Sequence, residues 1–126
     1  MNVVRFFLAI GASFAFVSAA LAENETDRFF ARAFEKAKPQ MENMLICFDF
    51  AAIKFAVQTC EPAETVVQAA YGACHTVEEE YVATVMKNAD LSREAVMDGL
   101  SEGKRQLSQV LLATVLKARI DSGRCQ

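Results

Sequence analysis

The sequence contains few of the residues that interrupt helices or shape tight turns. Its 126 residues include two prolines, five glycines and no tryptophan. No stretch alternates apolar and polar residues for long, and the chain has no internal repeat or low-complexity segment. These absences argue against a β-sandwich, a barrel or a solenoid. We therefore expect an all-α fold.

The chain also lacks the motifs on which most catalytic and cofactor sites are built. His75 is the only histidine, and neither Cys-x-x-Cys, Gly-x-Ser-x-Gly nor a glycine-rich phosphate loop occurs. A haem-attachment motif is approached at residues 71–75, but Tyr71 occupies the position of its first cysteine. His75 with Glu78 or Glu79 could share a metal, although a solvated His–carboxylate pair is the favoured interpretation. We expect no enzyme, no resident metal and no cofactor.

The chain has no large excess of either basic or acidic residues. It has 13 Lys and Arg residues against 16 Asp and Glu residues, a net charge of −3 at neutral pH. Phosphate binding requires clustered basic residues, so this balance argues against nucleic acid as a partner.

The first 22 residues have the pattern of a cleavable secretory signal. Arg5 supplies a positive charge, residues 6–17 are apolar apart from Gly11 and Ser13, and Ala20-Leu21-Ala22 has the small-x-small form of a cleavage site. The alternative is an uncleaved membrane anchor, because residues 6–22 approach the length of a span. We expect a signal peptide over 1–22 and one helical domain over 23–126. That domain would be periplasmic or secreted, with no stable membrane anchor after cleavage.

All four cysteines follow the predicted signal. An even count in an exported chain predicts two disulfides. Two of the three possible pairings would join cysteines about 20 Å apart along the same or adjoining helices, far beyond the reach of a bridge. The remaining pairing is Cys47–Cys74 with Cys60–Cys125.

Apolar periodicity and capping residues define the expected helices. A short helix over about 26–38 precedes three long antiparallel helices over about 40–58, 62–88 and 92–120. Pro39 should end the first, Ser92 should cap the start of the last, and Gly123 should help to stop it. The predicted fold is a small helical bundle cross-linked by two disulfides.

Two features of the long helices invite a more specific interpretation. Gly99 and Gly103 lie one turn apart on the apolar stripe of the last helix, which predicts the close approach of a neighbouring backbone. Asp49 interrupts a strongly apolar segment. It either forms a narrow solvent-facing line with Glu42, which is favoured, or is a partly buried carboxylate paired with a base such as Lys54 or Arg119.

The long helices carry more apolar surface than a three-helix core can bury. We expect the first helix to fold back so that its Phe29, Phe30 and Phe34 face covers the excess, and a row left uncovered would be a partner or ligand surface. The excess forms a candidate interaction surface of two rows: Ile46, Phe50, Ile53 and Val57, and Leu112, Leu116 and Ile120.

Two functions fit these expectations. The first is a non-catalytic protein–protein interaction module in the cell envelope, which binds an unknown protein partner or a second copy of itself, as a homodimer, through a leftover apolar row. The alternative is a carrier or chaperone-like binder of apolar ligands in the same compartment, with a cavity between the Phe-rich first helix and the bundle. The fold class alone favours neither.

Overall fold

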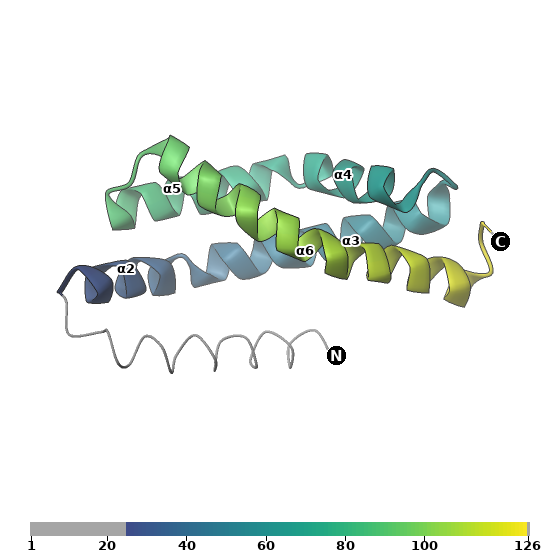
Figure 1. The fold of residues 1–126 in the computed structure, drawn as a ribbon, viewed down its shortest axis with the longest axis horizontal. Helices are drawn as coiled ribbons and strands as arrows, with labels where there is room; N and C mark the ends of the chain where they lie inside the picture. The colour runs from purple at the N-terminus through teal and green to yellow at the C-terminus, as the bar shows by residue number, and fades with distance from the viewer. Residues whose placement is uncertain (1–24, 126) are drawn as a thin grey trace.

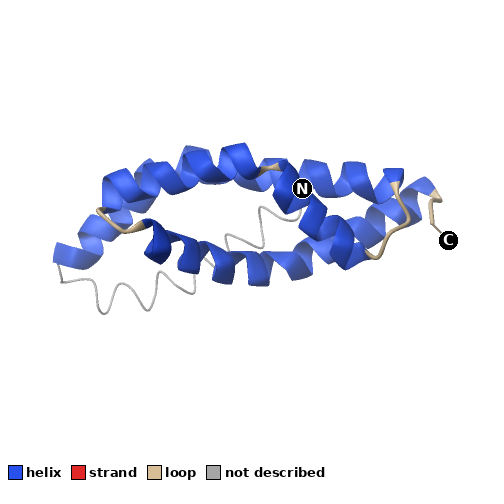
Figure 2. Cartoon of the chain, turned by 90° about the horizontal axis from the view of Figure 1, so that it is seen from above, coloured by secondary structure: helices blue, strands red, loops and turns tan. Residues whose placement is uncertain are grey.

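A computed structural model describes residues 25–125 of the chain. The predicted signal peptide and its cleavage site lie outside the described residues. Over 25–125 every regular element is a helix: α2 (Glu25–Lys36), α3 (Lys38–Gln58), α4 (Ala63–Ala73), α5 (His75–Ala89) and α6 (Arg93–Ser122). Figure 2 shows how short the loops between them are. The predicted all-α, disulfide-stapled bundle is confirmed.

The helices run up, down and up along the long axis of the molecule. In Figure 1, α2 and α3 follow one another in one direction, α4 and α5 return in the other, and α6 runs again in the direction of α3. The amino-terminal half of α6 lies beside α5, and its carboxyl-terminal half crosses over α3. This divergence of α6 from α3 shapes the site described below.

Local sequence signals set both ends of α6 as expected. The Ser92 side chain accepts a hydrogen bond from the backbone N–H of Ala95 at 3.1 Å, which satisfies a donor that the first helical turn leaves free. Gly123 ends the helix in the left-handed conformation, with φ of 66°. A side chain would disfavour that conformation, so glycine suits the position.

Both predicted disulfides are present. Cys47 of α3 is bonded to Cys74, with 5.9 Å between their Cα atoms. Cys60, in the turn after α3, is bonded to Cys125 near the carboxyl terminus, with 5.3 Å between the Cα atoms. One bridge therefore fastens the middle of the bundle and the other fastens its end.

The expected helix over 62–88 is instead two helices that meet at Cys74. The backbone leaves helical geometry there, with φ of −101° and ψ of 17°. Cys74 is 1% exposed and tethered to α3, so α4 is held against α3 while α5 continues towards α2 and α6. The single-helix prediction was wrong: Gly72 has low helix propensity, but a lone glycine is tolerated inside helices and does not by itself indicate a break.

Two apolar clusters make up the core. The larger joins α3, α4 and α6 around Phe48, which is fully buried and meets the Tyr71 ring edge-on with centroids 4.8 Å apart. The smaller joins α2, α5 and α6 and contains Ala33, Ala37, Val82, Val85, Ala89 and Val96.

The position of α2 differs from the expectation. It does not fold back over the excess apolar rows but continues along the line of α3 and packs on α5. Ala33 and Ala37 are small enough to let the two helices approach, whereas Phe29 and Phe34 remain 42% and 48% exposed. Both rows of the candidate interaction surface are therefore left without cover from α2. No helix within residues 25–125 is long and apolar enough to cross a membrane.

Candidate functional site

An apolar groove of about 580 Å³ opens where α6 diverges from α3. Its walls are α6 on one side and the end of α2 with the first half of α3 on the other, and α5 contributes Tyr81 and Val85. Phe34 and Met41 are on its exposed edge, and Phe48 connects it to the main core. Of the described residues of α2, Phe34 alone lines the groove, so the groove lies mainly between α3 and α6 and not between the Phe-rich first helix and the bundle.

The two glycines of α6 line this groove. Gly99 and Gly103 are exposed, and a Cβ atom added to either would meet no atom within 4 Å. The predicted close approach of a neighbouring backbone is therefore wrong, because α6 and α3 are separated by the groove at the level of these glycines. What the glycines do instead is leave the α6 wall of the groove without side chains at two successive turns.

A buried ion pair stands at the inner end of the groove. Lys104 Nζ of α6 lies 2.5 Å from Glu78 Oε2 of α5, and their side chains are 24% and 7% exposed. The same ammonium group lies 5.0 Å from the centroid of the Tyr71 ring, within cation–π range. The pairing makes the burial of both charges tolerable. Glu78 was expected to be solvated, and the sequence offered no sign that a lysine 26 residues later would reach it.

Tyr71 anchors α4 to α6 beside this ion pair. Its hydroxyl donates a hydrogen bond to the backbone oxygen of Lys104 at 3.1 Å and shares another with Ser108 Oγ at 2.8 Å. Burial raises the pKa of Tyr71 above its ordinary value. The hydroxyl is therefore a structural group that is protonated at neutral pH.

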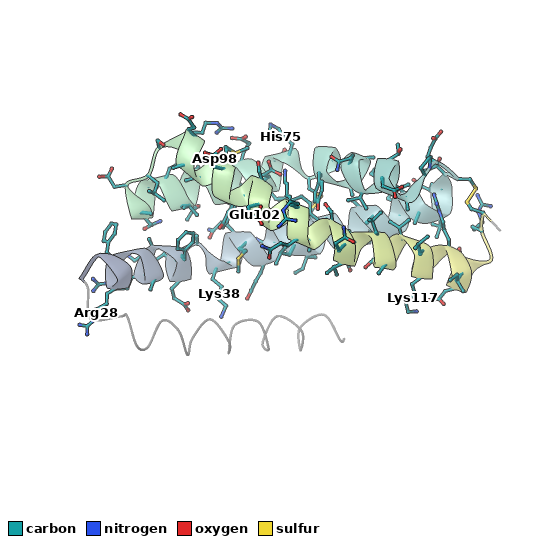
Figure 3. The ribbon with its side chains drawn as sticks, in the orientation of Figure 1. Arg28, Lys38, His75, Asp98, Glu102 and Lys117 are labelled. Carbon is teal, nitrogen blue, oxygen red and sulfur yellow. A yellow bond between two sulfur atoms is a disulfide. The ribbon has the colours of Figure 1, made fainter. Side chains whose placement is uncertain are left out.

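His75 does not share a metal-binding geometry with its neighbouring carboxylates. Figure 3 shows it projecting from the surface at the start of α5, and its Nε2 atom is 3.9 Å from Glu79 Oε1. Glu79 is held instead by both terminal nitrogens of Arg93, at 2.5 and 2.9 Å, and these hydrogen bonds lower its pKa. Within residues 25–125 no three His, Cys, Asp or Glu side chains gather as a metal site would require.

The structure also decides between the two interpretations of Asp49. Both Asp49 and Glu42 are exposed, so they form the solvent-facing line and not a buried carboxylate site. Arg119 is not a partner of Asp49. It donates hydrogen bonds to the carbonyl oxygens of Ala56, Thr59 and Glu61, which lie in or just after the last turn of α3.

The candidate interaction surface lies outside the groove on two helices. On α3, Ile46 is 67%, Phe50 70% and Ile53 41% exposed, with Val57 partly buried beside them. On α6, Leu116 is 52% and Ile120 68% exposed, and Leu112 packs partly against the core. None of these residues lines the groove. The molecule therefore presents a concave apolar site and two convex apolar rows.

Sequence reasoning foresaw the rows but neither the groove nor the ion pair at its end. One signal for the groove was present, because two glycines in mid-helix require an explanation. Comparison of the chain with family models, with curated proteins and with solved structures finds no match.

Proposed function

We propose that this chain is a non-catalytic binding protein that holds an apolar ligand in the groove between α2–α3, α5 and α6. The observation that carries the proposal is the groove itself. Its volume of about 580 Å³ falls in the range of roughly 300–1,000 Å³ that is usual for small-molecule sites. Such sites are lined mainly by apolar side chains with a few polar groups, and this groove has that composition.

The glycines support a role for the open space. A glycine inside a helix costs about 1 kcal/mol relative to alanine. Side chains at Gly99 and Gly103 would meet no obstruction, would strengthen α6 and would cover apolar surface that is now open to water. A ligand that occupies the space would account for both glycines, because it needs the room that side chains would fill.

The charges around the groove limit the kind of ligand. The cation that lines it, Lys104, is already paired with Glu78. The remaining polar side-chain groups of the lining are the amides of Gln106 and Gln109 and the hydroxyl of Tyr81. This arrangement suits an apolar or amphipathic molecule whose polar end is accepted by amides, and it does not suit a small multivalent anion.

The cysteine chemistry and the leader sequence favour a place for this activity. Two disulfides are consistent with an oxidising location outside the cytoplasm. The signal pattern of residues 1–22, with its short basic start and its Ala20-Leu21-Ala22 site, favours a bacterial periplasm over other secretory routes. We place the protein there. An amino-terminal sequence that begins at Glu23 is the expected result on purified material, and one that begins at Met1 would contradict it.

A second candidate function uses the convex rows. An interaction module of the cell envelope would bind another protein through Ile46, Phe50 and Ile53 or through Leu116 and Ile120. Their exposure supports this candidate, because large apolar side chains that share a helix face are typical of contact surfaces. The two functions are compatible, since the rows and the groove use different residues.

The groove can be tested by filling it. Titration of the purified protein with an environment-sensitive apolar dye, and then with a sixteen-carbon fatty acid as competitor, should give saturable binding of one ligand per groove. Gly103→Leu places a branched side chain in the groove and should weaken binding at least about tenfold. The matched control is Gly72→Leu, because Gly72 is also an exposed helical glycine with no atom near its added Cβ but lies outside the groove.

Two results would overturn the proposal. One is the absence of saturable binding to the wild-type protein at a ligand concentration of about 1 mM, the weak limit of specific binding. The other is an equal loss of affinity in Gly72→Leu and Gly103→Leu. Native mass spectrometry of protein taken from its own compartment adds the identity of any ligand that remains bound.

A further inference from the structure

The outer face of α3 carries a heptad pattern that the core does not use. Asn43, Ile46, Phe50, Ile53 and Val57 follow one another at spacings of three, four, three and four residues. A repeat of this kind, averaging 3.5 residues, places its members along a single seam of the helix. Ile46 and Phe50 are among the most exposed large apolar side chains of the described chain, and Ile53 is also exposed.

Opposite charges flank the seam on its two sides. Asp49 precedes Phe50 and Lys54 follows Ile53, which places them at the g and e positions of the heptad. Both are exposed, and within residues 25–125 neither forms an ion pair. A separation of five residues is too long for pairing along one helix turn, which requires three or four. It is the separation that joins g of one helix to e of the next in a parallel coiled coil.

We propose that a second copy of this chain docks on this seam, with the two α3 helices parallel and related by a two-fold axis along them. Asp49 of each copy then lies beside Lys54 of the other, so the dimer contains the ion pair twice. Asn43 faces its own counterpart, the arrangement by which a polar residue at this position sets register in parallel pairs. An antiparallel pair related by a two-fold axis would instead place acidic edge beside acidic edge.

The rest of the fold prepares α3 for this contact. A seam of two heptads, about 21 Å long, is too short to hold two free helices together because the chain would have to order itself first. Here α3 is already held by its buried face, which includes Met44, Phe48 and Ala52, and by the Cys47–Cys74 bridge. The seam lies on the opposite side from that buried face, so a second copy meets no other part of the core. A dimer with a Kd in the micromolar range is expected, on the order of −8 kcal/mol.

The dimer does not depend on the proposed ligand. No residue of the seam lines the groove. Loss of ligand binding with the dimer intact, or loss of the dimer with ligand binding intact, therefore separates the two proposals. The proposed dimer also assigns the α3 row of the candidate interaction surface to one partner, a second copy of this chain.

Sedimentation equilibrium over about 1–200 µM tests the dimer directly, a range that brackets a micromolar Kd. The wild-type mass should rise towards twice that of the monomer. Phe50→Asp should raise the Kd at least about a hundredfold, since it puts a charge into the seam of both copies. Ile120→Asp is the matched control, because Ile120 is 68% exposed against 70% for Phe50, and it should leave the Kd unchanged. Circular dichroism and a non-reducing mass confirm that each variant keeps its helices and both disulfides.

Charge exchange tests the orientation. Asp49→Lys and Lys54→Asp should each weaken the dimer about tenfold, because each places two like-charged pairs across the seam. The double variant restores both pairs with reversed sign and should return the Kd to within about threefold of the wild type. A wild type that stays monomeric to the highest concentration, equal effects of Phe50→Asp and Ile120→Asp, or a double variant weaker than either single one would each overturn the proposal.

Discussion

Replacing Gly99 and Gly103 with alanine should make this protein more stable, by about 1 kcal/mol at each position. Glycine loses more conformational freedom than alanine when a helix forms, and both residues lie well inside α6. The gain should appear in full because an added Cβ at either site meets no atom within 4 Å. For the predicted domain of residues 23–126, a gain of about 2 kcal/mol raises the Tm by roughly 8–16 °C.

Thermal and urea unfolding of the oxidised protein, followed by circular dichroism at 222 nm, measures this change. Gly123→Ala supplies the opposite sign as a control, since Gly123 has φ of 66° and alanine there should lose about 1 kcal/mol. A double variant less stable than the wild type would refute the reasoning. It would mean that a backbone or side chain packs against these glycines, as the sequence had suggested.

The same substitutions connect stability to function. Two methyl groups take room from the groove, so the variants that gain stability should bind the dye less tightly than the wild type. Such an opposition between stability and binding is common where a site must stay open. If Gly99→Ala and Gly103→Ala raised both stability and ligand affinity, the space beside α6 would not be the binding site.

Three further perturbations test other parts of the fold. Mild dithiothreitol should reduce the Cys60–Cys125 bridge before the Cys47–Cys74 bridge, because Cys60 and Cys125 are both exposed. Alkylation followed by intact-mass analysis gives the order of reduction, and simultaneous reduction of both bridges would contradict this prediction. Ser92→Ala should cost about 1 kcal/mol in urea unfolding, whereas Ser92→Asp should retain most of the capping energy, so equal losses would exclude the cap as the cause. Lys104→Met should lower the free energy of unfolding by several kcal/mol, because it leaves Glu78 buried without its partner. Adding Glu78→Met should recover most of that loss. A double variant as unstable as the single one would show that the lost ion pair is not the cause of the destabilisation.

Much of the fold could be predicted because its causes are local or topological. Ser92 and Gly123 set the ends of α6 through hydrogen bonds and a backbone conformation within a few residues of themselves. The pairing of Cys47 with Cys74 and of Cys60 with Cys125 followed from helix lengths alone, since 1.5 Å per residue leaves one connectivity within reach. Counting the faces that a small bundle can bury showed that Ile46 and Phe50 exceed what a three-helix core needs, although α2 was expected to cover part of this excess.

The site itself was less accessible from the sequence. Glu78 looked solvated because its partner, Lys104, lies on another helix and is brought to it only by packing. Gly99 and Gly103 were recognised as unusual, yet their meaning depended on whether α6 approached α3 or diverged from it. No residue near them in the sequence carries that information, because the angle between two helices is set by all the side chains between them.

The amino-acid sequence by itself determined that this chain is helical, doubly cross-linked and richer in apolar surface than its core requires. Only the tertiary structure decided where that surface lies. The helix break at Cys74 and the small residues Ala33 and Ala37 carry α2 onto α5, which leaves the outer face of α3 uncovered and a groove beside α6. Periodicity shows which residues share a face of one helix, but the partner of that face is chosen by packing across the whole bundle.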